Sequence, residues 1–218
     1  MFVQTNFDAS SCYDRIIPNV AMLASRKYGV PEESTVMNAK TLEKAEYRMR
    51  TELGLAPTGY SHSEADPIYG TGQGRANSPA IWCFVSITLF ECYKEVSHAA
   101  NYCTPTFDQN LQLNMIAYVD NSNGQTNSFQ YNDQTKIVNC TLTKVRHNAQ
   151  AWINLLGVSG GAVELSKCSC LIMEWICSFQ GAPVLSPRHR KEVQIQVSDP
   201  TIALPRLKSS HHIKPIKH

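Results

Sequence analysis

The chain has 218 residues, of which 43% are hydrophobic and only 17% are charged, and its formal net charge is +2. This composition supports a packed core and argues against a disordered chain. Because the net charge is small, bulk charge alone cannot hold the protein on nucleic acid, and such binding would need a local groove.

No targeting or membrane signal is visible in the sequence. The longest apolar run, 80–90, is shorter than the roughly 20 residues that cross a bilayer. The N-terminus has no basic segment followed by an apolar one, so it does not resemble a signal peptide. We therefore expect an intracellular protein, in cytoplasm or nucleus, without membrane contact.

The eight cysteines are scattered, and no CxxC pair occurs among them. Cys168 and Cys170 form a lone CxC, whereas a zinc site needs four ligands, usually in closely spaced pairs. Reduced and mostly buried thiols are the expectation for these side chains. A small metal-binding interaction module built on the cysteines is kept as an alternative function.

The first elements in chain order are a strand and two helices. Alternating side chains predict a strand over 2–7, with Asp8 at its end. A helix is expected over 16–28. A second helix begins at Pro31, carries apolar residues at helical spacing, and ends at Gly54.

A loop or hairpin is expected over 55–74, and a long helix follows it. Ser78 as N-cap and Pro79 at the first helical position predict the start of this helix, which continues to about His98. Its apolar residues lie all round, which predicts burial on most sides.

The next segments alternate strands with one helix. A strand is predicted over 111–117, and Asn-Gly in the turn signal 121–124 places 118–121 at the tip of a β-hairpin. A helix is expected over 133–156, and Gly160-Gly161 precedes a strand over 162–165.

The last elements are a hairpin and a tail. The runs 171–179 and 184–185 flank a turn and predict the hairpin. From residue 188 onward the sequence contains seven Lys or Arg but only two acidic residues, so we expect a loosely ordered basic tail.

Three segments stand out together: Phe-Asp-Ala-Ser-Ser-Cys-Tyr-Asp at 7–14, Gly-Gln-Gly-Arg-Ala-Asn-Ser-Pro at 72–79, and Ala-Tyr-Val-Asp-Asn at 117–121. In order and spacing they resemble motifs A, B and C of the reverse transcriptase palm. Those motifs are an aspartate with an aromatic residue five positions on, a Gln-Gly with Ser-Pro at a helix start, and a Tyr-x-Asp-Asp hairpin. Alone, each segment also fits an ordinary strand end, loop or turn.

The resemblance continues beyond these three segments. Residues 160–168 resemble motif D, and the hairpin around Trp175 and Gly181 resembles motif E. The resemblance covers roughly residues 2–185, and the local amino-acid sequence is most similar to that of retrotransposon polymerases of protists and algae.

The resemblance implies an α+β polymerase palm with an antiparallel sheet packed on helices, partial fingers, and a thumb that is missing or rudimentary. We expect palm with partial fingers over 1–186, of which about 30–70 is fingers-like, and a basic C-terminal tail over 187–218. Because the chain begins just before motif A, the upstream fingers segments are expected to be missing.

Nucleotidyl transfer explains why two carboxylates far apart in sequence would have to meet. Two divalent cations about 3.5–4 Å apart activate the attacking hydroxyl and stabilise the leaving pyrophosphate. Mg²⁺ (or Mn²⁺) binds hard oxygen ligands. Asp8 at a strand end and Asp120 at a hairpin tip can share such ions if their strands are neighbours.

Residue roles follow from the resemblance. Asp8, Asp120 and the backbone carbonyl of Ala9 are the expected metal ligands. Lys167 matches the motif D lysine, which protonates or neutralises pyrophosphate, with a solvated lysine as the alternative. The expected nucleotide-binding residues are Ala9, Tyr13 under the sugar, and Gln73 and Gly74 in the pocket wall. For Tyr13 the alternative is a packed core tyrosine.

Asn121 departs from the pattern, because the family usually has a second aspartate there. Asparagine keeps an oxygen ligand but lacks the negative charge, which weakens cation binding. The resemblance implies an RNA-directed DNA polymerase domain of a retrotransposon, with a primed RNA or DNA template and deoxynucleoside triphosphates as partners. The alternative is a catalytically inactive, truncated palm relic that at most binds nucleic acid.

Overall fold

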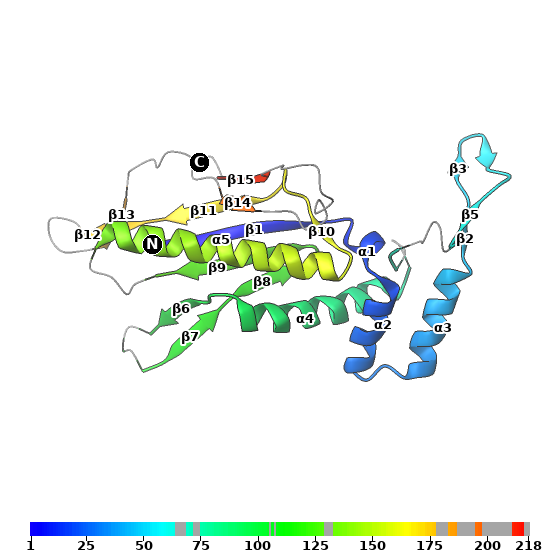
Figure 1. Cartoon of the computed structure of the whole chain (residues 1–218), viewed down its shortest axis with the longest axis horizontal. Coiled ribbons are helices and arrows are strands. Elements are labelled where there is room, and N and C mark those ends of the chain that lie inside the picture. Colours follow the sequence, from blue (N-terminus) through cyan, green and yellow to red (C-terminus); the bar gives the residue numbers. More distant parts are fainter. Residues whose placement is uncertain are drawn as a thin grey trace. The chain divides into compact units, whose positions relative to one another are not determined.

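The structure of the protein is a computed structural model, and it describes residues 1–63, 69–71, 75–104, 106, 108–128, 133–177, 183–186, 195–197 and 211–215. The chain divides into two compact units (Figure 1). The first comprises Met1–Ser10 with Leu89–His218, and the second comprises Ser11–Thr88. Each unit is described by itself.

The main sheet of the first unit is organised around its N-terminal strand β1 (Phe2–Ser10). Val3 and Phe7 are buried while Asp8 is half-buried, as expected for a strand with one face on the core. The strand order is β14-β15-β11-β1-β9-β8, and β10 pairs with the end of β1. All neighbours are antiparallel except β11 and β15. The remaining strands are β8 (Met115–Tyr118), β9 (Asn121–Asn127), β10 (Ala162–Val163), β11 (Ser169–Met173), β14 (Ile195–Val197) and β15 (His211–Pro215).

Helix α5 (Gln134–Val158) packs on the sheet, with contacts to β1, β9, β10 and β14. It begins where expected, because the Asp133 side chain caps it by accepting a hydrogen bond from Thr135 N at 2.8 Å. Its buried residues Val145, Ala149, Trp152 and Leu156 recur at helical spacing. This confirms the expected α+β class with an antiparallel sheet packed on helices.

Helix α4 (Ser78–Val96) begins at Ser78, one residue before the predicted first helical position Pro79, and the prediction that it is buried on most sides is wrong. Its buried residues Ile81, Trp82, Val85, Leu89 and Tyr93 form one stripe, while Ile87 is 39% and Val96 is 49% exposed. In the first unit, Phe90 and Tyr93 pack on Trp152 with ring centroids 5.3 and 5.6 Å apart. The helix is therefore buried along one side only. Because apolar residues also occur on its exposed side, its sequence wrongly suggested burial all round.

The predicted single strand over 111–117 is two strands with a break at Asn114. β7 (Asn110–Leu113) pairs with β6 (Ala100–Cys103), whereas β8 pairs with β9. At the break, Asn114 Nδ2 donates to Ser97 Oγ at 2.8 Å and the Asn114 carbonyl accepts from Gln125 N at 2.9 Å. These polar contacts redirect the chain from one hairpin into the other.

The C-terminal part contains one hairpin that was expected and two strands that were not. β12 (Trp175–Cys177) pairs with β13 (Pro183–Leu185), as predicted. The tail was expected to be loosely ordered, but its described residues form β14 and β15 of the main sheet. Ile195 and Val197 are buried, which gives this segment an apolar anchor.

The second unit consists of helices and small hairpins: α1 (Cys12–Arg15), α2 (Pro18–Lys27), α3 (Glu32–Glu43), β2 (Glu46–Tyr47), β3 (Arg50–Thr51), β4 (Gly54–Leu55), β5 (Tyr60–Ser61) and the first part of α4. The helix predicted to reach Gly54 ends at Glu43 instead. Met49 is 72% and Leu53 is 100% exposed, so their helical spacing has no apolar surface to pack on. Gly54, at φ +118°, serves the β3–β4 turn.

Among the helices that the structure describes, none has both the length and the apolar character that crossing a membrane requires.

Candidate functional site

The hairpin β8–β9 turns within two residues, Val119 and Asp120. Tyr118 pairs with Asn121 across the turn, and Val119 adopts φ +55°. The two turn residues therefore lie four positions before Asn123-Gly124, and 121–124 belongs to β9 instead. Asp120 is held at the tip of the hairpin, as the sequence predicted.

β9 brings this tip to the end of β1. Asp8 is the register partner of Asn121, and Ala9 N donates to the Asp120 carbonyl at 3.0 Å. Two carboxylates more than a hundred positions apart in sequence therefore come from the same end of adjacent strands. This is the strand neighbourhood that the sequence analysis required.

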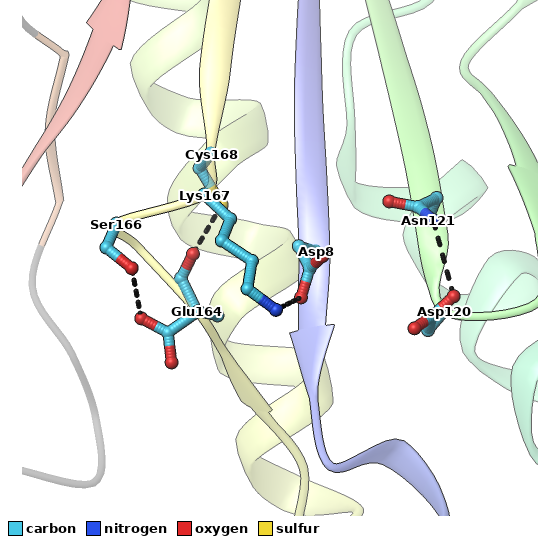
Figure 2. A network of polar contacts seen from close by, with 7 residues as sticks. All are labelled: Asp8, Asp120, Asn121, Glu164, Ser166, Lys167 and Cys168. Atoms are coloured by element: carbon cyan, nitrogen blue, oxygen red, sulfur yellow. Dashed lines mark hydrogen bonds and ion pairs between the residues drawn. The ribbon is translucent and has the colours of Figure 1, made fainter.

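A second segment fixes Asp8 from the other side of β1. β10 pairs with Ala9 and Ser10, and Glu164 N donates to the Asp8 carbonyl at 2.8 Å. The following turn closes with Lys167 N donating to the Glu164 carbonyl at 2.9 Å. Figure 2 shows this turn on one side of β1, with Asp120 and Asn121 on the other.

The turn places a cation against Asp8. Lys167 Nζ lies 3.6 Å from Asp8 Oδ1, with the Lys167 side chain 64% exposed and the Asp8 side chain 20% exposed (Figure 2). The mostly solvated ammonium makes this a weak ion pair, because water screens it. Lys167 can therefore leave Asp8 at little cost.

Asn121 interacts with its neighbour in the hairpin. Asn121 Nδ2 donates to Asp120 Oδ1 at 3.3 Å, so the amide occupies one oxygen of the candidate ligand (Figure 2). An aspartate at this position would add a negative charge instead of a donor. With asparagine at 121 the site is therefore less negative than it would be with aspartate, and Asp120 has a neutral partner.

Cys168 is buried beside this group and is chemically quiet. Its Sγ lies 3.5 Å from the Glu164 carbonyl, to which it donates. The pKa of the Cys168 thiol is raised to about 11, mainly by burial; the negative charges of Asp8 and Glu164 act in the same direction, and a hydrogen bond from the Asp8 backbone opposes them. The thiol is therefore protonated at neutral pH and is a poor nucleophile.

The donor set suits a magnesium-type cation in kind. No group of three His, Cys, Asp or Glu side chains gathers in the described ranges. The available ligands are two carboxylates, the Asn121 amide oxygen and the Ala9 carbonyl, all hard oxygens. That Asp8 already faces a lysine ammonium indicates that its carboxylate attracts positive charge.

The structure brings together five of the eight predicted site residues: Asp8, Ala9, Asp120, Asn121 and Lys167. Tyr13 belongs to the second unit, where its ring meets Trp82 edge-on at 6.4 Å and its carbonyl accepts from Thr71 N at 2.7 Å. Gln73 and Gly74 lie outside the described residues.

Sequence reasoning missed Glu164, which connects the turn to Asp8. Its backbone N–H holds the Asp8 carbonyl and its side chain accepts from Ser166 Oγ at 2.6 Å. A short strand after Gly160-Gly161, followed by a Glu-x-Ser-Lys turn, was the available signal. It was noted only for its lysine.

The architecture is thus a mixed α+β sheet protein with two acidic residues at one end of neighbouring strands. No family model matches the chain, and no curated protein matches it. Among solved structures it is similar to telomerase from Candida tropicalis in complex with a TWJ fragment of telomeric RNA, with 15% identity, a TM-score of 0.46, and coverage of 78% of this chain and 26% of that one.

Two further telomerase structures are similar. Apo telomerase from Candida tropicalis truncated from its C-terminal domain gives 16% identity, a TM-score of 0.45, and coverage of 78% and 30%. Telomerase from Candida albicans in complex with a TWJ fragment of telomeric RNA gives 11% identity and a TM-score of 0.44, with coverage of 85% of this chain and 30% of that one. The chain spans less than a third of these solved chains, and similarity at this level does not assign an activity to it.

Proposed function

We propose that this chain is the palm of a retrotransposon reverse transcriptase, an RNA-directed DNA polymerase that works by two-metal nucleotidyl transfer. The observation that carries the proposal is the register of β1 and β9, which brings Asp8 and Asp120 to one end of neighbouring strands. The motif order in the sequence supports the same activity, with a primed template and deoxynucleoside triphosphates as substrates.

Asp8, Asp120 and the Ala9 carbonyl would hold Mg²⁺ or Mn²⁺, which supplies hydroxyl activation and neutralises phosphate charge when bound. The β-sheet hydrogen bonds to Ala9 and Asp8 keep the two acidic residues in place. The exposed Lys167 ammonium lies close enough to this site to offset negative charge on a leaving phosphate.

A second candidate function is nucleic-acid binding without catalysis. It is favoured by Asn121, whose amide both replaces the expected acid and bonds Asp120. Each candidate carboxylate thus already has a partner, Lys167 for Asp8 and Asn121 for Asp120.

The test measures Mn²⁺ binding by electron paramagnetic resonance and extension of a DNA primer on an RNA template, both on the full chain. We expect Asp8→Asn and Asp120→Asn each to weaken Mn²⁺ binding by at least about tenfold, since one ion–carboxylate contact is worth more than 1.4 kcal/mol. Both variants abolish primer extension.

Asp133→Asn is the matched control, because it removes one carboxylate far along the sequence and asparagine also caps helices. It should leave both readouts unchanged. If the wild-type chain binds Mn²⁺ but does not extend the primer, and Asn121→Asp restores extension, the result supports the catalytically inactive palm relic. The two-metal proposal is wrong if the wild-type chain binds no Mn²⁺. It is also wrong if Asp8→Asn, Asp120→Asn and the control Asp133→Asn all behave alike.

A further inference from the structure

The second unit contains a cavity of about 250 Å³ between α2, α3 and the first turns of α4. Its walls are mainly apolar and include Ala21, Met22, Ala39, Leu42, Ile81 and Phe84. Alanines from two helices leave the space open, where larger side chains would fill it. A cavity of about 150 Å³ with such walls already binds benzene, so this one has room for a fused-ring molecule.

The cavity wall is rigid where it is aromatic. Phe84 stacks on Tyr28 with ring centroids 5.7 Å apart and planes at 15°, so the orientation of its ring is fixed. Met22 contributes a polarisable thioether, which contacts aromatic rings favourably. These two groups suit an aromatic occupant.

Three of the four hydroxyl side chains in the wall, those of Ser25, Thr35 and Thr71, donate to the protein itself. Ser25 Oγ donates to the Ala21 carbonyl and Thr35 Oγ1 to the Glu32 carbonyl, both at 2.8 Å. Among the lining residues that the structure describes, none is charged. An occupant is therefore uncharged, which excludes a nucleoside triphosphate.

One polar pair in the wall keeps unused hydrogen-bonding capacity. Asn77 Nδ2 donates to Asn38 Oδ1 at 3.0 Å. Within the described part of the chain, Asn38 Nδ2 and Asn77 Oδ1 have no partner. The two bonded amides therefore leave one donor and one acceptor for another molecule, whichever way the amides turn.

We propose that this cavity is a binding site for a small uncharged heteroaromatic molecule of one or two rings with an adjacent hydrogen-bond donor and acceptor. The rings lie among the apolar walls, and the polar edge bonds Asn38 and Asn77. The site lies wholly within the second unit and contains none of the metal-site residues, so it does not depend on the polymerase proposal.

The test titrates the full chain with 7-azaindole and with indole and follows its ¹H–¹⁵N spectrum. Both probes fit the apolar walls, but only 7-azaindole carries an acceptor beside its N–H. We expect 7-azaindole to bind about tenfold more tightly than indole, since one additional hydrogen bond contributes about 1 kcal/mol or more. Asn38→Ala should remove this difference.

Ala39→Leu fills the cavity and should weaken binding of both probes by at least about tenfold. Lys40→Leu adds the same side chain at an exposed neighbouring position outside the cavity and should leave binding unchanged. The inference is overturned if neither probe binds, if Ala39→Leu leaves binding intact, or if Asn38→Ala keeps the preference for 7-azaindole. Because Asn38→Ala only shortens a side chain, it stays informative if Ala39→Leu does not fold.

Discussion

The backbone of Asp8 is held by a hydrogen bond, and the negative charge of its side chain is partly offset by a lysine. Its carbonyl accepts from Glu164 N while its carboxylate faces the Lys167 ammonium. The backbone contact fixes where Asp8 lies, whereas the solvated ion pair contributes little energy. At the scale of single residues, Lys167 is therefore a competitor for whatever cation Asp8 takes.

Replacing Lys167 by Met should tighten Mn²⁺ binding by about two- to fivefold. The change removes a positive charge 3.6 Å from Asp8 Oδ1, and a screened contact of this kind is worth at most about 1 kcal/mol. The measurement is a Mn²⁺ titration by electron paramagnetic resonance at low salt, where screening is weakest. Lys136→Met, at an exposed position of α5, serves as control; equal affinities for the two variants would contradict the prediction.

Sequence reasoning predicted the acidic pair of the site but not its surroundings. A strand end and a hairpin tip are recognisable from local pattern, and the resemblance to the reverse transcriptase motifs implied that Asp8 and Asp120 would be neighbours. The hydrogen bond from Asn121 to Asp120 and the backbone contact of Glu164 depend on sheet register. Register is set by burial over whole strands, which short motifs do not record.

At the scale of elements, the β8–β9 turn is placed by the sheet against local preference. Val119, a β-branched residue, adopts φ +55°, where such side chains are strained. The better turn sequence, Asn123-Gly124, lies in β9, with Gly124 near Phe7 and the Tyr93 hydroxyl. Keeping Ser122, Gly124 and Thr126 on the buried face outweighs the strain at the tip.

Val119→Gly should therefore raise the free energy of unfolding by about 1 kcal/mol, because glycine adopts positive φ without steric cost. Urea denaturation monitored by tryptophan fluorescence measures the change. The control is Val158→Gly in the last turn of α5, an exposed position where glycine should instead lower stability by up to about 1 kcal/mol. A destabilised Val119→Gly protein would mean that the valine side chain contributes more than its backbone strain costs.

Helices and strands were predicted best where local signals and burial agree. Asp133 caps α5 and Ser78 begins α4, as their sequences indicate. The extension of α3 to Gly54 failed because Met49 and Leu53 find no packing surface. Helical spacing is evidence for a helix only when another element covers the apolar stripe.

At the scale of the whole molecule, the described residues of the tail belong to the sheet. β15 pairs with β11, and β14 places Ile195 and Val197 in the core at 1% and 4% exposure. Both residues belong to the run Val-Gln-Ile-Gln-Val at 193–197, whose strict alternation of apolar and polar residues is a strand signal that the sequence analysis overlooked. The basic composition of the tail concealed these two anchors.

A chain that ends at Ser186 should lose about 3–6 kcal/mol of stability, because two buried aliphatic side chains contribute about 1.5–3 kcal/mol each. Chemical denaturation of the shortened and full-length chains measures the difference. The double variant Ile195→Ala with Val197→Ala in the full chain separates loss of the two anchors from loss of the tail. Unchanged stability in both would favour the loosely ordered tail expected from composition.

The central position of β1 also bears on how the protein is made. During translation, β1 leaves the ribosome well before its two neighbours, which come from residues 121–127 and 169–173. Contacts of such large sequence separation form slowly, and an unpaired strand edge invites association with other chains. The nascent chain must therefore carry β1 unpaired until residues 121–127 and 169–173 have been synthesised, so β1 is a segment that chaperone binding would protect.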